Sequence, residues 1–140
     1  MRDMPIGSLA ERTGVKVPTI RYYEQAGLMP TAARTEGNRR VYDAKDVSRL
    51  RFIRHARDLG FEVDAIRQLL DLADQPERPC EGVDAIARVH LREIDSKISR
   101  LTALRAEVRR MTDECAHGRV GDCRVIQVLA DHGQCASDAH

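Results

Sequence analysis

The 140-residue sequence is poor in aromatic side chains and has no long apolar run. It contains no tryptophan, and only 4% of its residues are aromatic, which favours a helical protein with a modest core. No apolar segment approaches the roughly 20 residues of a membrane-spanning helix, and the N-terminus has no apolar signal segment. We therefore expect a cytoplasmic protein with no membrane partner.

Cysteine is also scarce, with four residues at positions 80, 115, 123 and 135. Thiols of cytoplasmic proteins rarely form structural disulfides, so these residues are better candidates for metal ligands or sensors. No activated nucleophile and no pair of catalytic carboxylates stands out in the sequence. We therefore predict that the protein is not an enzyme.

Neither glycine nor proline occurs between residues 83 and 111. Apolar residues recur there at alternating steps of four and three, which is the heptad spacing of a coiled coil. The positions are Ala87, Leu91, Ile94, Ile98, Leu101 and Val108, with one interruption at Arg105. A helix of this length, about 40 Å, cannot bury a narrow apolar stripe within so small a chain. We expect it to pair antiparallel with a second copy, which would bring the Cys80 end of one chain beside the Cys115 end of the other. An unpaired helix is the alternative.

The charge is unevenly distributed, although the net charge is only +1. Residues 1–60 carry 12 Lys and Arg against 7 Asp and Glu, a balance of +5, and residues 61–140 carry 11 against 15, a balance of −4. A basic N-terminal part joined to an acidic C-terminal part is typical of a nucleic-acid-binding domain attached to a cation-binding module. An incidental skew on a hydrated surface would give the same totals.

Two short helices are predicted over residues 6–12 and 17–25, with a tight turn at Thr13-Gly14 between them. This is the pattern of a helix-turn-helix, in which the second helix enters the major groove of DNA. The residues expected to face DNA are Thr19, Arg21, Tyr22 and Tyr23. Tyr23 is ambiguous, because its ring can pack inward while its hydroxyl donates to a phosphate. A helical hairpin used only for packing is the alternative.

The next segment, residues 31–42, predicts two short strands around a turn at residues 36–38. Arginines cluster here, and planar guanidinium groups bind phosphates bidentately. The residues expected to contact DNA are Arg34, Arg39, Arg40 and Tyr42. The segment predicts a β-wing beside the helix-turn-helix, with a solvated loop as the alternative.

Two further helices are predicted over residues 43–58 and 61–73. Asp43 and Asp46 have the spacing of an N-terminal capping box. The side chains expected in the core are Val47, Leu50, Ile53, Leu59, Val63, Ile66, Leu69, Leu70 and Leu72. The other face of the first helix carries four arginines that we expect at phosphates or in solvent: Arg49, Arg51, Arg54 and Arg57. Arg57 is included among the candidate DNA contacts.

A glycine-containing loop with a thiol at each end runs from Cys115 to Cys123. Thiolates are soft ligands that prefer zinc and its heavier relatives to magnesium or calcium. Three thiolates and one further donor complete a tetrahedral zinc site. His117, inside the loop, is a candidate for an extra nitrogen ligand, and a solvent-exposed histidine fits its position equally well. Weaker candidates lie in the tail, at His132, Cys135 and His140.

Five motifs occur in one order along the chain. They are Ile6-Gly7, Ile20-Arg21-Tyr22-Tyr23-Glu24, Gly27-Leu28, Arg40-Val41-Tyr42 and Arg57-Asp58-Leu59-Gly60-Phe61. In this combination the chain resembles, over nearly its whole length, the MerR family of bacterial transcription regulators. The resemblance implies a mainly α fold in three parts: a winged helix-turn-helix DNA-binding domain at residues 1–75, a long antiparallel coiled-coil dimerisation helix at residues 80–114, and a metal-binding loop, short helix and tail at residues 115–140.

The resemblance also implies an effector. Family members that sense divalent soft metals have a cysteine at the position of Cys80, where sensors of monovalent metals have a serine. In the divalent branch Cys80 of one subunit joins Cys115 and Cys123 of the other. The expected effector is therefore zinc, cadmium, lead or mercury.

The implied function is metal-dependent activation of a promoter for metal resistance or efflux. A homodimer would bind double-stranded promoter DNA and distort it when metal binds, so that RNA polymerase can use both promoter elements. The alternative is a regulator of the same type that senses copper(I) or another effector, with the cysteines forming a structural clamp of the dimer.

Overall fold

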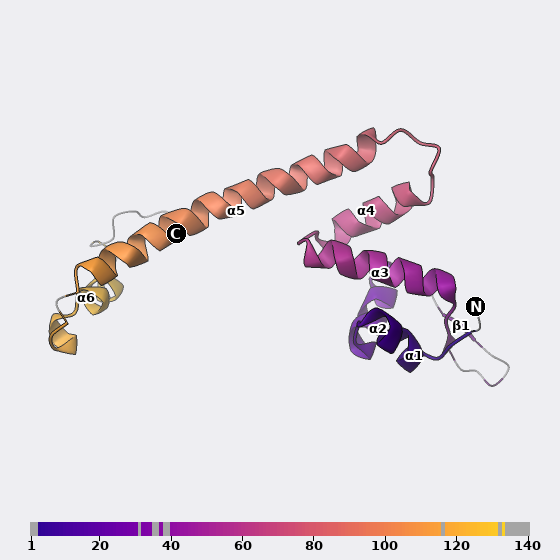
Figure 1. The fold of residues 1–140 in the computed structure, drawn as a ribbon, viewed down its shortest axis with the longest axis horizontal. Coiled ribbons are helices and arrows are strands. Elements are labelled where there is room, and N and C mark those ends of the chain that lie inside the picture. Colours follow the sequence, from indigo (N-terminus) through magenta and orange to yellow (C-terminus); the bar gives the residue numbers. More distant parts are fainter. Residues whose placement is uncertain are drawn as a thin grey trace. The chain divides into compact units, whose positions relative to one another are not determined.

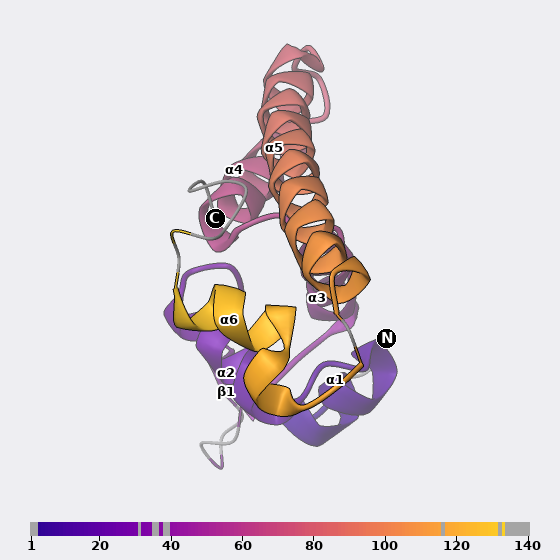
Figure 2. The same cartoon turned by 90° about the vertical axis from the view of Figure 1, so that its left-hand side faces the viewer.

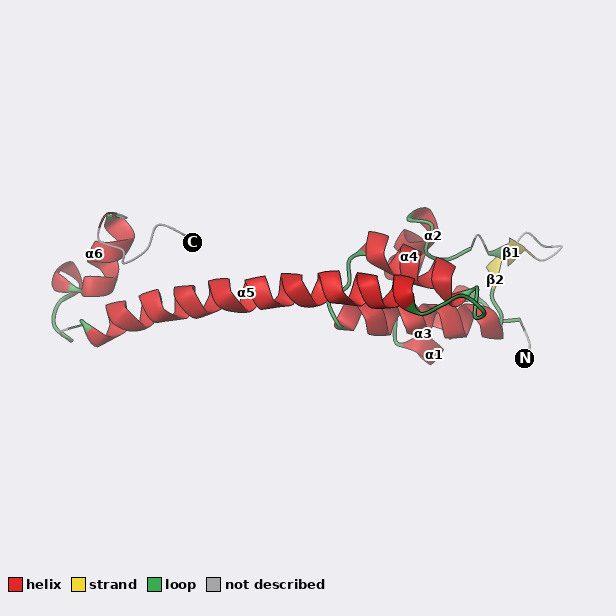
Figure 3. Ribbon diagram, turned by 90° about the horizontal axis from the view of Figure 1, so that it is seen from above, coloured by secondary structure: helices red, strands yellow, loops and turns green. Residues whose placement is uncertain are grey.

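The computed structural model describes residues 3–30, 32–34, 37, 40–115, 117–131 and 133 (Figure 1). In chain order its elements are α1 (Ile6–Thr13), α2 (Val17–Gln25), β1 (Ala33–Arg34), β2 (Arg40–Val41), α3 (Ala44–Asp58), α4 (Val63–Ala73), α5 (Glu81–Asp113), the 3₁₀ helix η1 (Val120–Asp122) and α6 (Arg124–Ala130). They form two compact units, Met1–Ala87 and Arg88–His140. Helices dominate the described residues, and a two-stranded wing separates α2 from α3 (Figure 3). The predicted mainly α fold is confirmed.

The core of the first unit lies among α1, α2, α3 and α4. Helix α3 packs against α1 on one side and against α4 on the other (Figure 1). The fully buried side chains of this unit are Leu9, Ile20, Leu28, Tyr42, Leu50, Ile53 and Ile66. The apolar faces predicted for α3 and α4 therefore meet the buried side chains of α1 and α2 in one small core.

Leu59 is an exception to the predicted core. It is 58% exposed, because it follows the last residue of α3 and forms the C-cap instead of lying on the buried face. Leu69 and Leu72 of α4 are half-buried. Helix α4 begins at Val63, two residues later than predicted.

The predicted capping box closes the N-terminus of α3. The Asp43 carboxylate accepts hydrogen bonds from the amides of Lys45 at 3.0 Å and Asp46 at 3.1 Å, and Asp46 Oδ2 accepts one from the Asp43 amide at 2.9 Å. These bonds satisfy amide groups that have no partner within the helix. They also fix the point at which the wing ends and α3 begins.

Two arginines of α3 bind the C-terminal end of α1. Arg54 Nη1 donates to the Thr13 carbonyl at 2.5 Å, and Arg51 Nη2 donates to the Arg12 carbonyl at 3.2 Å. The last carbonyls of a helix have no partner within it, and they carry the negative end of the helix dipole. A guanidinium group satisfies both requirements at once.

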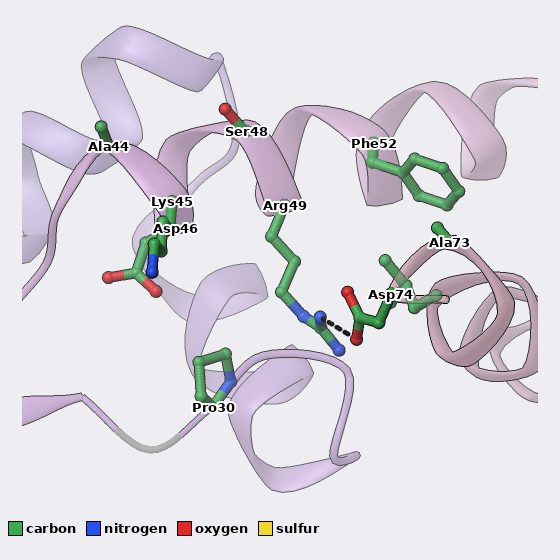
Figure 4. A pocket seen from close by; sticks show the side chains of 10 residues that line it. Pro30, Ala44, Lys45, Asp46, Ser48, Arg49, Phe52, Ala73 and Asp74 are labelled. Atoms are coloured by element: carbon green, nitrogen blue, oxygen red, sulfur yellow. Dashed lines mark ion pairs between the residues drawn. The ribbon is translucent and has the colours of Figure 1, made fainter. Parts of the chain in front are cut away.

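The C-cap of α2 and the turn that follows it are held by arginines of α4 and α3. Arg49 Nε donates to the Leu28 carbonyl at 2.6 Å, and Arg67 Nη2 donates to the Ala26 carbonyl. The Arg49 guanidinium also lies 3.7 Å from Asp74, in a pocket of about 590 Å³ between α3 and the end of α4 (Figure 4). Three of the four α3 arginines that we expected at phosphates or in solvent therefore hold the helix-turn-helix against α3.

Gly14 permits the close approach of Arg54. It is the C-cap of α1 with a φ of 73°, and its amide donates to the Ala10 carbonyl at 2.8 Å. Glycine adopts this left-handed conformation without strain. A Cβ atom at this position would collide with the Arg54 guanidinium.

Helix α5 exposes the predicted apolar seam on a single chain. It is slightly longer than predicted, and Leu91, Ile98 and Leu101 are 55%, 55% and 61% exposed. A row of exposed apolar side chains of this length is typical of a surface that contacts another molecule. Pairing with a second copy remains the proposed explanation of this seam.

The second unit continues past α5 into η1 and α6 (Figure 2). Its buried apolar side chains are Met111, near the end of α5, and Val128 in α6. Across the described ranges, no helix has both the length and the apolar character needed to cross a bilayer.

We expect Gly14→Ala and Arg54→Ala to be strongly coupled in stability. Gly14→Ala should lower the free energy of unfolding by about 2–4 kcal/mol, because left-handed strain of about 1–2 kcal/mol is added to the loss of a charged hydrogen bond. In an Arg54→Ala background only the strain should remain. Urea unfolding of the four proteins at one protomer concentration measures the coupling.

Lys45→Ala is the matched control, because Lys45 is exposed in the first turn of the same helix. It should change the free energy of unfolding by less than about 0.5 kcal/mol. Additive effects of Gly14→Ala and Arg54→Ala, within about 0.5 kcal/mol, would contradict the contact.

Candidate functional site

The exposed side of α2 carries residues predicted to read DNA. Arg21 is exposed and Tyr22 is 52% exposed, whereas Thr19 is half-buried. Tyr23 is only 7% exposed, and its ring centroid lies 5.7 Å from that of Tyr22. The Tyr23 ring therefore belongs to the core, and Arg21 and Tyr22 are the side chains of this helix best placed to contact a duplex.

The wing is an antiparallel pair in which Ala33 faces Val41 and Arg34 faces Arg40. Arg34 and Arg40 are both exposed. Directly opposite side chains lie on the same face of a sheet, where two positive charges repel each other. Both guanidinium groups therefore belong to one exposed face of the wing. Arg39, the third predicted wing arginine, lies outside the described residues.

Tyr42, expected at the DNA surface, lies in the core instead. It is 1% exposed, and its hydroxyl donates to Glu24 Oε1 at 3.1 Å. Burial and then the charge of Glu24 raise the pKa of Tyr42 to about 12. Tyr42 is buried because it follows the last residue of β2 and its backbone pairs with that of Met4.

Glu24 joins the recognition helix to the wing. Besides accepting the Tyr42 hydrogen bond, its carboxylate lies 3.8 Å from the Arg40 guanidinium. Arg21, Glu24, Gln25 and Arg40 line a polar cleft of about 540 Å³. A basic residue of α2 and a basic residue of the wing thus border one cleft, together with the Glu24 carboxylate.

Arg57, the last predicted DNA contact, has a partner in its own chain. Its Nη1 atom donates to the Phe61 carbonyl at 3.1 Å, although the side chain is exposed. This bond spans the turn between α3 and α4. It gives Arg57 a structural role that does not depend on DNA.

The two cysteines at the ends of the loop lie side by side. Cys115 Sγ and Cys123 Sγ are 3.9 Å apart, and both residues are half-buried. Cys123 is the N-cap of α6, and the backbone amides of Ile126 and Val125 lower the pKa of its thiol. Two thiolates bound to one zinc ion at about 2.3 Å, in tetrahedral geometry, lie about 3.8 Å apart. The pair therefore has the spacing of two ligands of one ion.

Within the described part of a single chain, no third metal-binding side chain completes this pair. Cys80 is exposed and comes directly before α5. His117 is exposed, with a left-handed φ of 54°. Among the described residues, no three His, Cys, Asp or Glu side chains lie close enough to hold a metal ion together. The tail candidates His132, Cys135 and His140 fall outside those residues.

Comparison with known proteins identifies the family. The pattern of MerR HTH family regulatory proteins matches residues 4–73, and the pattern described as MerR, DNA binding matches residues 47–111. The chain belongs to the MerR family. It is 39% identical to the HTH-type transcriptional regulator ZntR of Escherichia coli, over 89% of this chain and 90% of that protein.

Two solved structures of MerR proteins extend the comparison. The transcription regulator PbrR691 of Ralstonia metallidurans, in complex with lead(II), has a TM-score of 0.79 at 38% identity and matches over 90% of this chain and 98% of its own. MerR of Bacillus megaterium, in complex with mercury(II), has a TM-score of 0.69 at 28% identity, over 91% of this chain and 99% of its own.

Sequence reasoning missed Glu24 as the link between α2 and the wing in this MerR-family chain. The Ile-Arg-Tyr-Tyr-Glu motif contains Glu24, but the motif does not show that its carboxylate meets Tyr42 and Arg40. It also missed an ion pair beside the thiols, between Glu114 and Arg124. The signal for that pair was available, because each charged residue is the neighbour of a predicted metal ligand.

We expect Tyr42 to make the folded chain less stable above pH 10. Its folded-state pKa of about 12 exceeds the unfolded value of about 10. Its contribution to the free energy of unfolding is therefore complete below pH 10 and is lost as the pH rises to 12. Two pKa units correspond to about 2–3 kcal/mol.

Tyr42→Phe is the comparison, because it lacks the titrating hydroxyl and keeps the ring. Between pH 10 and pH 12 the native chain should lose about 2–3 kcal/mol of unfolding free energy relative to this variant. Ionisation of Tyr42 near pH 10 in the folded protein, measured as the difference in tyrosinate absorbance between the native chain and Tyr42→Phe, would show that the hydroxyl is not held by Glu24.

Proposed function

We propose that this MerR-family protein is a metal-responsive transcription regulator. It binds promoter DNA as a homodimer and activates a metal resistance or efflux promoter when zinc, cadmium, lead or mercury binds. The observation that carries the proposal is the 3.9 Å separation of the Cys115 and Cys123 thiols, a spacing suited to two ligands of one soft ion. Similar proteins solved with lead(II) and mercury(II) support the same class of effector.

A second chain would complete the metal site. Helix α5 has 33 residues, and a helix of that length spans about 50 Å. Cys80 comes directly before this helix and Cys115 two residues after it, so one chain cannot bring both to one ion. An antiparallel partner would bring the partner's Cys80 to the Cys115 and Cys123 pair. The apolar seam that α5 exposes supplies the surface for that pairing.

The same dimer would present two helix-turn-helix units to DNA. Two-fold symmetry of the protein matches a two-fold-related pair of half-sites on the duplex. Arg21 and Tyr22 of α2 are the proposed contacts in the major groove. Arg34 and Arg40 of the wing are the proposed phosphate contacts, and they fix the position of α2 without reading sequence.

The response to metal follows from where the ligands lie. Thiols shared between two chains tie the end of one α5 to the beginning of the other, which favours one arrangement of the dimer over its alternatives. Bending and untwisting a promoter costs a few kcal/mol. A roughly hundredfold preference of the metal for one arrangement supplies a free energy of that size. The DNA would then be reshaped for RNA polymerase when metal is present.

We expect Cys80→Ser and Cys115→Ser each to abolish metal-dependent activation while DNA binding persists. When the two variant chains are mixed before assembly, some sites should return. About half of the dimers would be mixed, and each would keep one of its two sites, or about a quarter of the native number. Cadmium titration followed by thiolate-to-metal absorbance counts the sites, and a promoter reporter follows activation.

Retained induction in the Cys115→Ser protein would remove the sensing role of the loop. Absence of recovered sites in the mixture would show that the site is not shared between chains. A reporter titration with zinc, cadmium, lead and mercury beside copper(I) tests the effector class. Activation by copper(I) alone would contradict the divalent assignment.

We expect Arg40→Ala to weaken promoter binding to a similar degree on all DNA sequences. The slope of log K against log salt concentration should fall by about 1 per protomer, because one phosphate contact is lost. Arg100→Ala is the control, since Arg100 is an exposed arginine of α5 that was not predicted to contact DNA. An unchanged slope in Arg40→Ala would contradict the proposed phosphate contact.

A further inference from the structure

An ion pair bridges the cysteine loop beside the two thiols. Glu114 directly precedes Cys115, and Arg124 directly follows Cys123. Glu114 Oε2 accepts a hydrogen bond from Arg124 Nε at 2.6 Å, while the two sulfur atoms lie 3.9 Å apart. The charged pair and the thiol pair therefore connect the same two segments of chain at adjacent positions.

The ion pair is anchored on α5. Arg110 Nη1 lies 3.3 Å and 3.4 Å from the two carboxylate oxygens of Glu114, and Arg110 Nη2 donates to Glu107 Oε1 at 2.6 Å. Glu107 is only 6% exposed. The buried carboxylate of Glu107 thus holds Arg110, and Arg110 orients Glu114 from the last turns of the helix. We call Glu114, Arg110 and Arg124 the loop clamp.

A second ion pair within the loop has none of these features. Arg119 and Asp122 are 3.7 Å apart, and their side chains are 92% and 71% exposed. An isolated pair in solvent contributes little to stability or geometry. It provides an internal comparison for the loop clamp, since it lies in the same segment and has the same charges.

We propose that the residues of the loop clamp are positioning residues that hold Cys115 and Cys123 at ligand distance before a metal ion arrives. Bringing the ends of a loop together has an entropic cost. If the loop clamp already holds the loop ends together in the metal-free protein, metal binding does not have to order them. The site then binds the metal ion more tightly. The effect on metal affinity rests on the proposed function, whereas the closeness of the thiols does not.

The closeness of the thiols is measured by thiol–disulfide exchange. The 140-residue chain with Cys80→Ser and Cys135→Ser retains only Cys115 and Cys123. At equilibrium with glutathione, these two thiols lose two electrons and two protons as their disulfide forms, and one glutathione disulfide is reduced to two glutathione molecules. The ratio of the two forms gives the effective concentration of one thiol at the other.

Glu114→Gln and Arg124→Gln should each lower this effective concentration by about threefold to tenfold. The double variant should fall no further than either single variant, because both remove the same interaction. Arg124→Lys keeps the charge and should retain most of the native value. Arg119→Gln, the matched control, should leave the value unchanged.

An unchanged effective concentration in Glu114→Gln and Arg124→Gln would overturn the positioning role. An equal fall in Arg119→Gln would overturn it too, since any charge in the loop would then serve. A double variant that falls by the product of the two single effects would likewise show that the two residues act separately.

Cadmium titration of chains with all four cysteines separates this inference from the proposed function. If both hold, the cadmium Kd of Glu114→Gln rises by about the fold that the effective concentration falls. If the native chain binds no cadmium through thiolates, the proposed function fails, and the glutathione result still supports the clamp. If Glu114→Gln lowers the effective concentration of the two thiols but leaves the cadmium Kd unchanged, the loop clamp does not position metal ligands.

Discussion

The DNA-binding unit depends on hydrogen bonds from arginine side chains of α3 and α4 to backbone carbonyls at, or just beyond, the ends of α1 and α2. Those two helices have 8 and 9 residues, which is too short for helices that are stable by themselves. Each ends in carbonyl groups that need a partner. Guanidinium groups provide that partner and set the direction from which α3 approaches. In a core with few aromatic side chains, these bonds add an orientation that apolar contact alone does not impose.

This arrangement divides the arginines of the basic N-terminal part into two groups. Arg49, Arg51 and Arg54 of α3 are bonded to backbone carbonyls of the helix-turn-helix. Arg21, Arg34 and Arg40 lie on the exposed faces of α2 and the wing. The net charge of the first 60 residues therefore overstates the charge that is available to phosphates. It also explains how a strongly basic segment folds without a matching number of acidic side chains.

The sequence predicts the helices of the first unit closely because local signals set their ends. The bounds of α2 coincide with the prediction, since Gly14 and Gly27 flank it and Pro18 suits its first turn. The capping box of α3 is equally local. The arginine contacts are not, because Arg54 and its acceptor are 41 residues apart and the acceptor is a backbone atom that every residue type possesses. Tyr42 was misplaced for the same reason, since its pairing with Met4 joins distant parts of the chain.

At the candidate metal site, too, the local features are predicted from the sequence and the contacts with distant residues are not. A loop with cysteines at both ends predicts a thiol pair, and the structure brings the two sulfur atoms together. The sequence also names His117 and, through the family resemblance, Cys80 of the second chain as further ligands, and the described residues of one chain complete no group of three. Glu114 and Arg124, the charged neighbours of the two cysteines, hold the ends of the loop together. A search of the sequence for metal-binding residue types does not reveal this contact.

The exposed seam of α5 also has a genetic consequence. Under the proposed pairing, a chain with a damaged recognition helix and an intact seam still captures a normal chain. The mixed dimer then reads only half of a two-fold operator, so such damage would be dominant in a cell that carries both alleles. Damage to the seam itself, for example a charge in place of Leu101, removes the chain from assembly and would be recessive.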